Sequence, residues 1–202
     1  DERMINFIKG LNYLDERIAR LTSPFDIDAK DVELPPSQEY TANTLVNTIV
    51  GTRKNHFPII ILLTRQDSVS KQLVAQKTAA KLNIQLFCLP AELLPSQTQE
   101  SDDFARLWQR ESLLLPIAGY IDAHKTESLG KHVPENSGSN LSLQRFLRIS
   151  QGVFFLDVKE ISSELSSFST IVDVKRPTPL EQRMAWDQLL GESANGSASL
   201  LA

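Results

Sequence analysis

A lysine within a short polar segment is the first candidate for chemistry, because its neighbours have the spacing of a phosphate-binding loop. The segment runs from Arg65 to Gln72 and reads Arg-Gln-Asp-Ser-Val-Ser-Lys-Gln. In the pattern G-x-x-x-x-G-K-[ST], the glycines let the backbone wrap the phosphates, the lysine reaches the outer phosphates and the hydroxyl holds Mg²⁺. Ser70, Lys71 and Gln72 fall at the last three positions, where only Lys71 matches.

Three departures from this pattern oppose phosphate binding, each for its own reason. Arg65 and Ser70 stand where glycines would give the backbone its freedom. Gln72 replaces the hydroxyl that ligates the metal, and Asp67 adds a negative charge where phosphate oxygens would approach. The spacing alone does not establish a phosphate site, and a solvated lysine in the first turn of a helix is the alternative interpretation of Lys71.

A second candidate position follows the apolar run Ile117–Ile121, which ends in Asp122 and Ala123. Enzymes that hydrolyse phosphate bonds on such folds place two acidic residues here, one for Mg²⁺ and one to polarise the attacking water. Ala123 has no group that could polarise water. The alternative interpretation of Asp122 is a turn or cap residue at a strand end.

Other arrangements of reactive side chains do not predict a catalytic site. The histidines, at positions 56, 124 and 132, share no ligand spacing with one another or with the single cysteine, Cys88, so no metal site is predicted. No G-x-S-x-G sequence is present, and a serine hydrolase therefore has no support. We predict no catalytic residues.

Short apolar runs that alternate with helical patterns must position these candidates. Five such runs predict strands, at 57–63, 84–89, 117–121, 152–156 and 170–174. Helices are predicted at 40–51, 69–82, 102–114 and 141–150, with a surface loop over 124–140. This alternation predicts an α/β layered domain with a mostly parallel sheet, whose working surface lies beyond the carboxyl ends of the strands.

The two ends of the chain carry further helical signals. Apolar residues before position 22 recur at helical spacing and predict two short amphipathic helices, which a Pro-rich connector over 22–36 then follows. Thr178, Pro179 and Glu181 form a capping-box sequence, which predicts a final helix that runs to about Leu190.

Composition restricts the partners. The 202 residues are 41% hydrophobic and carry a formal net charge of -4, as in an ordinary globular domain. No basic cluster exceeds Arg53-Lys54 or Lys175-Arg176, so nucleic acid is not an expected partner. No apolar run approaches the roughly 18 residues of a membrane span, and with one cysteine and no secretory signal we expect a cytoplasmic protein without a membrane partner.

With these positions assigned, the chain resembles the large α/β subdomain of AAA+ ATPases. More narrowly, it resembles the first, degenerate module of bacterial tandem AAA+ proteins that carry an N-terminal winged-helix region. The segments behind this resemblance are 1–5 with 14–17, 107–111, and 176–183. The likeness spans most of the chain, to about Leu190.

The resemblance implies a three-layer domain of the P-loop NTPase type, with a five-stranded sheet of order 5-1-4-3-2. It implies that Lys71 is the Walker A lysine and Asp122 the Walker B aspartate. It further implies a helical lid and another AAA+ module in the same polypeptide, and a homo-oligomeric ring. We expect N-terminal helices and connector over 1–35, the AAA+ subdomain over 36–190, and a tail over 191–202 that leads to the lid.

The departures from the family shape the functional prediction. Besides the lost glycines, Ala123 replaces the Walker B glutamate, and Asp157 stands where a sensor asparagine or threonine is expected. We therefore predict a structural or regulatory platform in a larger AAA+ ATPase, which requires no cofactor and does not hydrolyse ATP itself. Its nucleotide-binding remnant, whose ligand would be ATP with Mg²⁺, comprises Ser70, Lys71, Gln72 and Asp122. The alternatives are an active or weakly active enzyme with an atypical P-loop, and a protein-interaction domain without nucleotide.

Overall fold

A computed structural model describes residues 2–25, 33–52, 58–65, 67–123, 138–158 and 163–190, with only the backbone at 138–140 and 189–190. The helices are α1 (Glu2–Ile8), α2 (Glu16–Ala19), α3 (Pro36–Thr52), α4 (Ser68–Lys81), the 3-10 turn η2 (Ala91–Leu93), α5 (Thr98–Leu114), α7 (Gly138–Ile149), α8 (Ser163–Ser166) and α9 (Pro179–Leu190). The strands are β1 (Ser23–Pro24), β2 (Ile59–Thr64), β3 (Gln85–Pro90), β4 (Ile117–Asp122), β5 (Val153–Asp157) and β6 (Thr170–Asp173).

The strands form one mixed sheet of order β1-β3-β4-β5-β2-β6. The five longer strands are parallel and follow the predicted order 5-1-4-3-2, which confirms the α/β class and this order. The predicted number of five strands is wrong, because β1 adds an antiparallel edge strand against β3. Its two residues lie in the Pro-rich connector and include a proline, a residue confined to edges within sheets, so no period-two pattern marks it.

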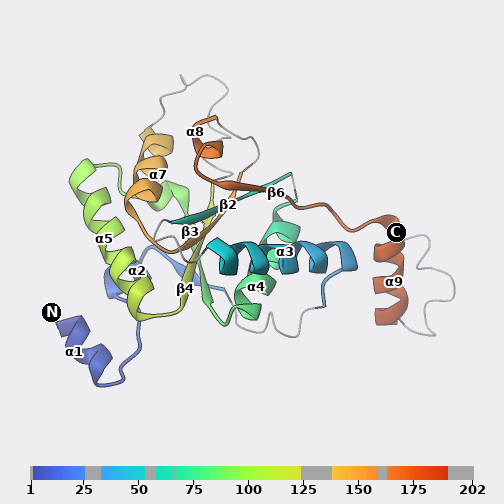
Figure 1. Ribbon diagram of the computed structural model, residues 1–202, viewed down its shortest axis with the longest axis horizontal. Coiled ribbons are helices and arrows are strands. Elements are labelled where there is room, and N and C mark those ends of the chain that lie inside the picture. The colour runs from blue at the N-terminus through green and yellow to red at the C-terminus, as the bar shows by residue number, and fades with distance from the viewer. Residues whose placement is uncertain are drawn as a thin grey trace.

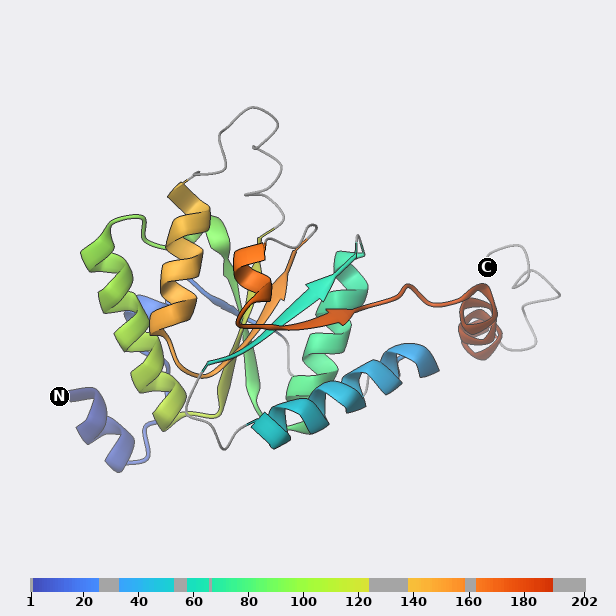
Figure 2. The ribbon, with the colours of Figure 1, turned by 45° about the horizontal axis from the view of Figure 1, so that its top comes forward.

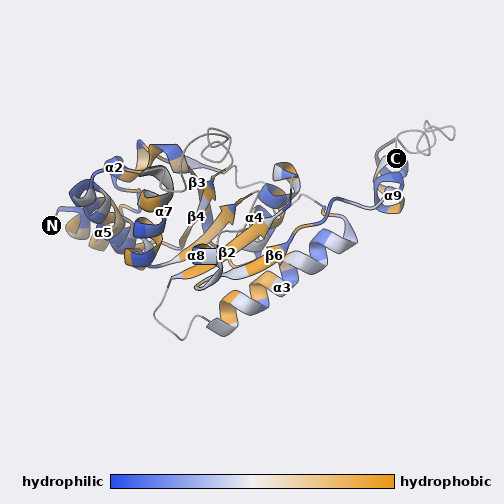
Figure 3. Ribbon diagram, turned by 90° about the horizontal axis from the view of Figure 1, so that it is seen from above, coloured by the Kyte–Doolittle hydropathy of each residue, from blue (hydrophilic) through white to orange (hydrophobic). Residues whose placement is uncertain are grey.

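Helices cover both faces of the sheet, in three layers (Figures 1 and 2). Ile60 and Leu62 of β2 belong to the core beneath α5 and α7, whereas Ile59, Ile61 and Leu63 face the core beneath α3 and α4. Both faces of β2 are therefore buried, which explains its unbroken apolar sequence. Figure 3 shows β2 and its neighbouring strands as a hydrophobic band between the helices.

Trp108 of α5 and Phe154 of β5 fill one core layer, with ring centroids 5.5 Å apart. Gly119 on β4 makes room for them. A Cβ atom at this position would lie 2.9 Å from Phe154 Cδ1 and 3.2 Å from Trp108 Cζ2. Glycine is therefore required here by close packing.

Several predicted boundaries differ from the structure. The helix predicted at 102–114 begins at Thr98, and α7 begins at Gly138 inside the predicted loop; the rest of that loop, 124–137, lies outside the described residues. The short elements η2 and α8 were not predicted, because three or four residues give no periodic signal. The capping box of α9 is confirmed, since Thr178 N donates to Glu181 Oε2 at 2.8 Å.

Candidate functional site

The candidate site lies where β2, β4 and β5 end and α4 begins. β2 ends at Thr64, and Arg65 then adopts a φ of 89°, the left-handed region that favours glycine. The backbone thus keeps a bend at the first glycine position of the phosphate-loop pattern, although an arginine occupies it. An ion pair with Asp173 at the end of β6 holds the Arg65 side chain.

Lys71 points into the protein, and its side chain is 0% exposed. Its ammonium group forms an ion pair with Asp157, whose side chain is also 0% exposed, and donates a hydrogen bond to the Val158 carbonyl at 3.1 Å. The alternative interpretation of Lys71 as a solvated surface lysine is therefore wrong. Because a buried charge is tolerated only when it is paired, Asp157 accounts for the burial of Lys71.

Two hydroxyl groups complete this site. Tyr120 Oη donates to Asp157 Oδ2 at 2.8 Å, and Ser68 Oγ donates to the same oxygen. Burial, reinforced by the Asp157 carboxylate, holds the pKa of the Tyr120 hydroxyl well above its usual value, so the hydroxyl stays protonated and donates. We call Ser68, Lys71, Tyr120, Asp157 and Val158 the lysine cluster.

The N-terminus of α4 carries its own carboxylate. Asp67 is the N-cap, accepting hydrogen bonds from Ser70 N at 3.4 Å and from Ser70 Oγ at 2.8 Å. Gln38 of α3 donates to Ser70 Oγ at 2.8 Å, and Arg176 Nε lies 3.7 Å from Asp67 Oδ2. Backbone N–H groups at a helix N-terminus attract anions, and here a side chain of the protein meets that demand.

The structure brings the predicted remnant to one edge of the sheet. Ser70 and Lys71 are buried in the first turn of α4, and Gln72 follows them, half-buried. Asp122 ends β4 and lies in register with Asp157 on β5. Ala123 is buried, and its N–H donates to the Asp157 carbonyl at 3.2 Å. Whether Ser70, Lys71, Gln72 and Asp122 contact nucleotide stays a prediction.

Sequence reasoning placed Asp157 at this edge but did not predict its pairing with Lys71. It assigned no role to Ser68 or Tyr120. The available signal was a carboxylate directly after the fully apolar run Val153–Leu156, since an acidic residue so close to a buried strand needs a cationic partner.

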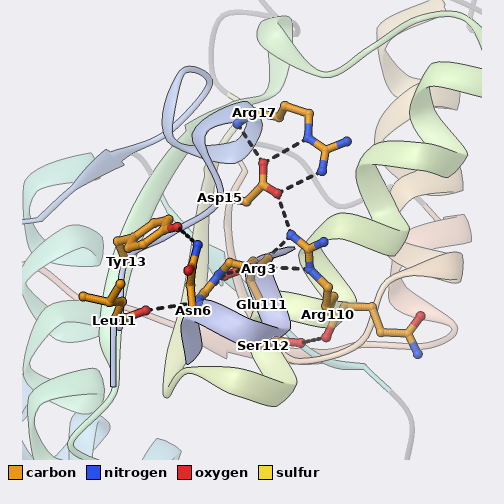
Figure 4. Close-up of polar contacts among 10 residues, drawn as sticks. Arg3, Asn6, Leu11, Tyr13, Asp15, Arg17, Arg110, Glu111 and Ser112 are labelled. Carbon is orange, nitrogen blue, oxygen red and sulfur yellow. Dashed lines mark hydrogen bonds and ion pairs between the residues drawn. The ribbon is translucent and has the colours of Figure 1, made fainter. Parts of the chain in front are cut away.

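A second polar cluster attaches the N-terminal segment to α5 (Figure 4). Arg3 Nε donates to Glu111 Oε2 at 3.1 Å, and Glu111 is 0% exposed. Arg110 Nη2 bridges Glu111 Oε1 at 2.9 Å and Asp15 Oδ2 at 2.5 Å. A hydrogen bond from Arg17 is the main cause that holds the pKa of the Asp15 carboxyl well below its usual value. We call these five residues the arginine cluster.

The predicted amphipathic packing of the first helix is wrong. Arg3 is the buried residue of α1, whereas Met4, Ile5 and Ile8 are exposed, Ile8 by 80%. Ion pairs therefore hold α1 to the body of the protein. Its apolar side chains remain at the surface, as at protein interaction sites.

No protein-family model and no curated protein sequence matches the chain. Its fold does match solved structures. A structure of an E. coli MS115-1 HORMA:CdnC:Trip13 complex aligns with a TM-score of 0.56 and 11% identity, over 89% of this chain and 78% of that chain. A Rhizobiales Trip13 aligns with a TM-score of 0.52 and 15% identity, over 85% of this chain and 75% of that chain. The chain thus shares its α/β fold with these Trip13 structures.

These matches correct the narrower resemblance. The solved structures that align are Trip13 chains, so the assignment to the first module of tandem proteins with a winged-helix region is wrong. At these identities the matches establish a common fold.

The described residues contain neither a set of metal ligands nor a membrane-spanning helix. No group of three or more His, Cys, Asp or Glu side chains among them is arranged to hold a metal ion. None of their helices combines the length and apolarity needed to cross a membrane. His56, His124 and His132 lie outside the described residues.

Proposed function

We propose that this chain is an AAA+-like module that does not hydrolyse ATP and serves as a structural or regulatory platform for other proteins. The observation that carries the proposal is the burial of Lys71 against Asp157, with both side chains 0% exposed. A lysine that serves a P-loop must present its ammonium group to the outer phosphates. In this chain the ammonium group already has an anionic partner.

The cost of binding a triphosphate supports the same conclusion. Moving Lys71 to a nucleotide would leave Asp157 buried without its cation, and breaking a buried ion pair costs about 3–5 kcal/mol. The Asp67 carboxylate at the start of α4 would also repel the phosphates. Ala123 offers no carboxylate to polarise water, so a bound nucleotide would meet no general base at that position.

Protein partners are supported by the exposed apolar residues of α1. The Trip13 structure of the E. coli complex contains a HORMA protein and CdnC, which makes protein recognition a reasonable role for a chain of the same fold. A lid subdomain and a homo-oligomeric ring are part of this proposal, on the strength of the fold likeness alone. A platform of this kind would act by shape and contact, without turnover.

Calorimetric titration with MgATP and a phosphate-release assay test the proposal directly. For the 202-residue chain we expect no binding heat at about 1 mM nucleotide, which corresponds to less than about 4 kcal/mol of affinity. Phosphate release should equal the buffer rate. A folded Lys71→Met variant serves as the control. Turnover in the wild-type chain that this variant loses would instead favour an active enzyme with an atypical P-loop.

A further inference from the structure

We infer that Asp157 is a positioning residue that withdraws Lys71 from the nucleotide edge, independently of the altered loop. The inference rests on the proposed function and names how its site is kept closed. The two oxygens of the Asp157 carboxylate have different partners. Oδ1 pairs with Lys71, while Oδ2 accepts hydrogen bonds from Tyr120 and Ser68.

The carboxylate is fixed from three elements of the fold. Ser68 begins α4, Tyr120 belongs to β4, and Asp157 itself ends β5. Because Tyr120 is 0% exposed within the sheet, the acceptor oxygen cannot follow Lys71 if that side chain swings outward. The anion is thus preorganised, and the flexible lysine adapts to it.

The hydrogen bond from Lys71 to Val158 supplies no counter-charge. The Val158 carbonyl accepts one hydrogen bond from Nζ at 3.1 Å but carries no charge. An asparagine at position 157 would keep the size of the side chain and an acceptor for Tyr120, yet remove the counter-charge. Burial disfavours an ammonium group that has lost the negative charge of Asp157, so we expect Lys71 to turn to the solvent at the start of α4.

The loop and Asp157 therefore block the site in different ways. Arg65 and Ser70 replace the glycines that would wrap phosphates, and Asp67 caps the helix that would attract them. Asp157 removes the cation itself. Restoring glycines at positions 65 and 70 would leave Lys71 buried, whereas Asp157→Asn would expose it without any change in the loop.

Amine labelling measures the exposure of Lys71 without reference to nucleotide. The folded 202-residue chain is treated with an acetyl N-hydroxysuccinimide ester, and each lysine is followed by peptide mass spectrometry. In the wild type we expect Lys71 to react at least about tenfold more slowly than the exposed Lys9 and Lys175. In Asp157→Asn, Lys71 should react at a rate close to theirs.

Asp173→Asn is the matched control, because it makes the same change at the end of β6 and disrupts the exposed pair with Arg65. It should leave Lys71 protected. Rapid labelling of Lys71 in the wild type would overturn the inference, as would continued protection in Asp157→Asn. Equal exposure in both Asp→Asn variants would also overturn it.

A second variant covers the case in which Asp157→Asn does not fold. Ser68→Ala with Tyr120→Phe keeps both charges but removes two hydrogen bonds from Asp157, and it should raise Lys71 labelling about threefold or more. Unchanged labelling would contradict the inference. The ATP tests remain separate. A wild type that hydrolyses MgATP while Lys71 is protected refutes the proposed function, and an ATP-inert wild type with reactive Lys71 refutes this inference.

Discussion

Lys71 of α4 and Asp157 of β5 form an ion pair in which neither side chain reaches solvent. The pair joins the first turn of a helix to the end of a central strand, at the edge of the sheet where a related fold would bind nucleotide. It accounts both for the local stability of this edge and for the absence of a free cation at Lys71.

The pair predicts strong coupling in a double-mutant cycle. Lys71→Met and Asp157→Asn should each lower the free energy of unfolding by about 3–5 kcal/mol, because each leaves the other member of the pair buried without its counter-charge. The double variant should lose less than the sum of the two, by about 1–3 kcal/mol. Urea unfolding followed by circular dichroism provides the free energies. Strictly additive losses would show that the two side chains do not interact.

Glu181 predicts a stability change in acid. Hydrogen bonds from Thr178 N, at 2.8 Å, and from Ser37 N, also at 2.8 Å, lower the pKa of Glu181 to about 2, from 4.5. Because the folded-state pKa is depressed, the contribution to stability is fully present above pH 4.5 and is lost as the pH falls towards about 2.

Glu181→Gln tests this linkage. The variant should lose about 0.5–2 kcal/mol at neutral pH, because Glu181 serves the first turns of both α3 and α9. Its unfolding free energy should then fall less than that of the wild type between pH 4.5 and about 2. Glu100→Gln makes the same change at an exposed site in the first turn of α5 and should retain the wild-type slope. The same pH dependence of the unfolding free energy in all three proteins would show that Glu181 does not stabilise the fold through these hydrogen bonds.

Alanine substitutions at Gly119 and Gly51 compare a tightly packed glycine with one in open space. Gly119→Ala should destabilise by about 1–3 kcal/mol, because the new Cβ meets Phe154 at 2.9 Å in a filled core layer. Gly51→Ala lies in α3 with nothing within 4 Å, so it should be neutral or stabilise by up to about 1 kcal/mol. Thermal unfolding of both variants tests this contrast. Equal effects would mean that Gly119 is not tightly packed.

We expect removal of the Arg3 side chain to loosen the N-terminal helix α1. Arg3→Ala should remove the main attachment of α1 and leave Glu111 with Arg110 alone, at a cost of about 3 kcal/mol. Hydrogen exchange should accelerate over residues 2–13 more than in the β-sheet. Arg20→Ala disrupts an exposed i,i+4 pair and should change stability by less than about 0.5 kcal/mol. Unaltered exchange at α1 in Arg3→Ala would contradict the role of the arginine cluster.

The sequence predicted those elements that a few adjacent residues specify. The unbroken apolar run at Ile59–Leu63 predicted a strand, and the capping box at Thr178 predicted the start of α9. Such features depend on a few adjacent residues. The antiparallel strand β1 and the exposed apolar residues of α1 depend on distant contacts, with β3 and with Glu111, which no local pattern encodes.

The candidate site shows the same contrast between features set by adjacent residues and features set by distant contacts. Positions 70–72 and Asp122 could be assigned to one edge from motif spacing and the rule for parallel sheets. The direction of the Lys71 side chain could not be predicted, because it depends on a carboxylate 86 positions further along the chain (157 minus 71). It also depends on the hydroxyl of Tyr120 on β4 and on that of Ser68 in the same helix. A lysine at this spacing fits a solvated, a nucleotide-bound or a buried state equally well in sequence.

A crystal structure of the chain grown with MgATP is the most direct test of the account. It should place Lys71 Nζ against Asp157, with no triphosphate density beside Ser70. Well-defined phosphates between Lys71 and the start of α4, with Asp157 released from the lysine, would contradict it.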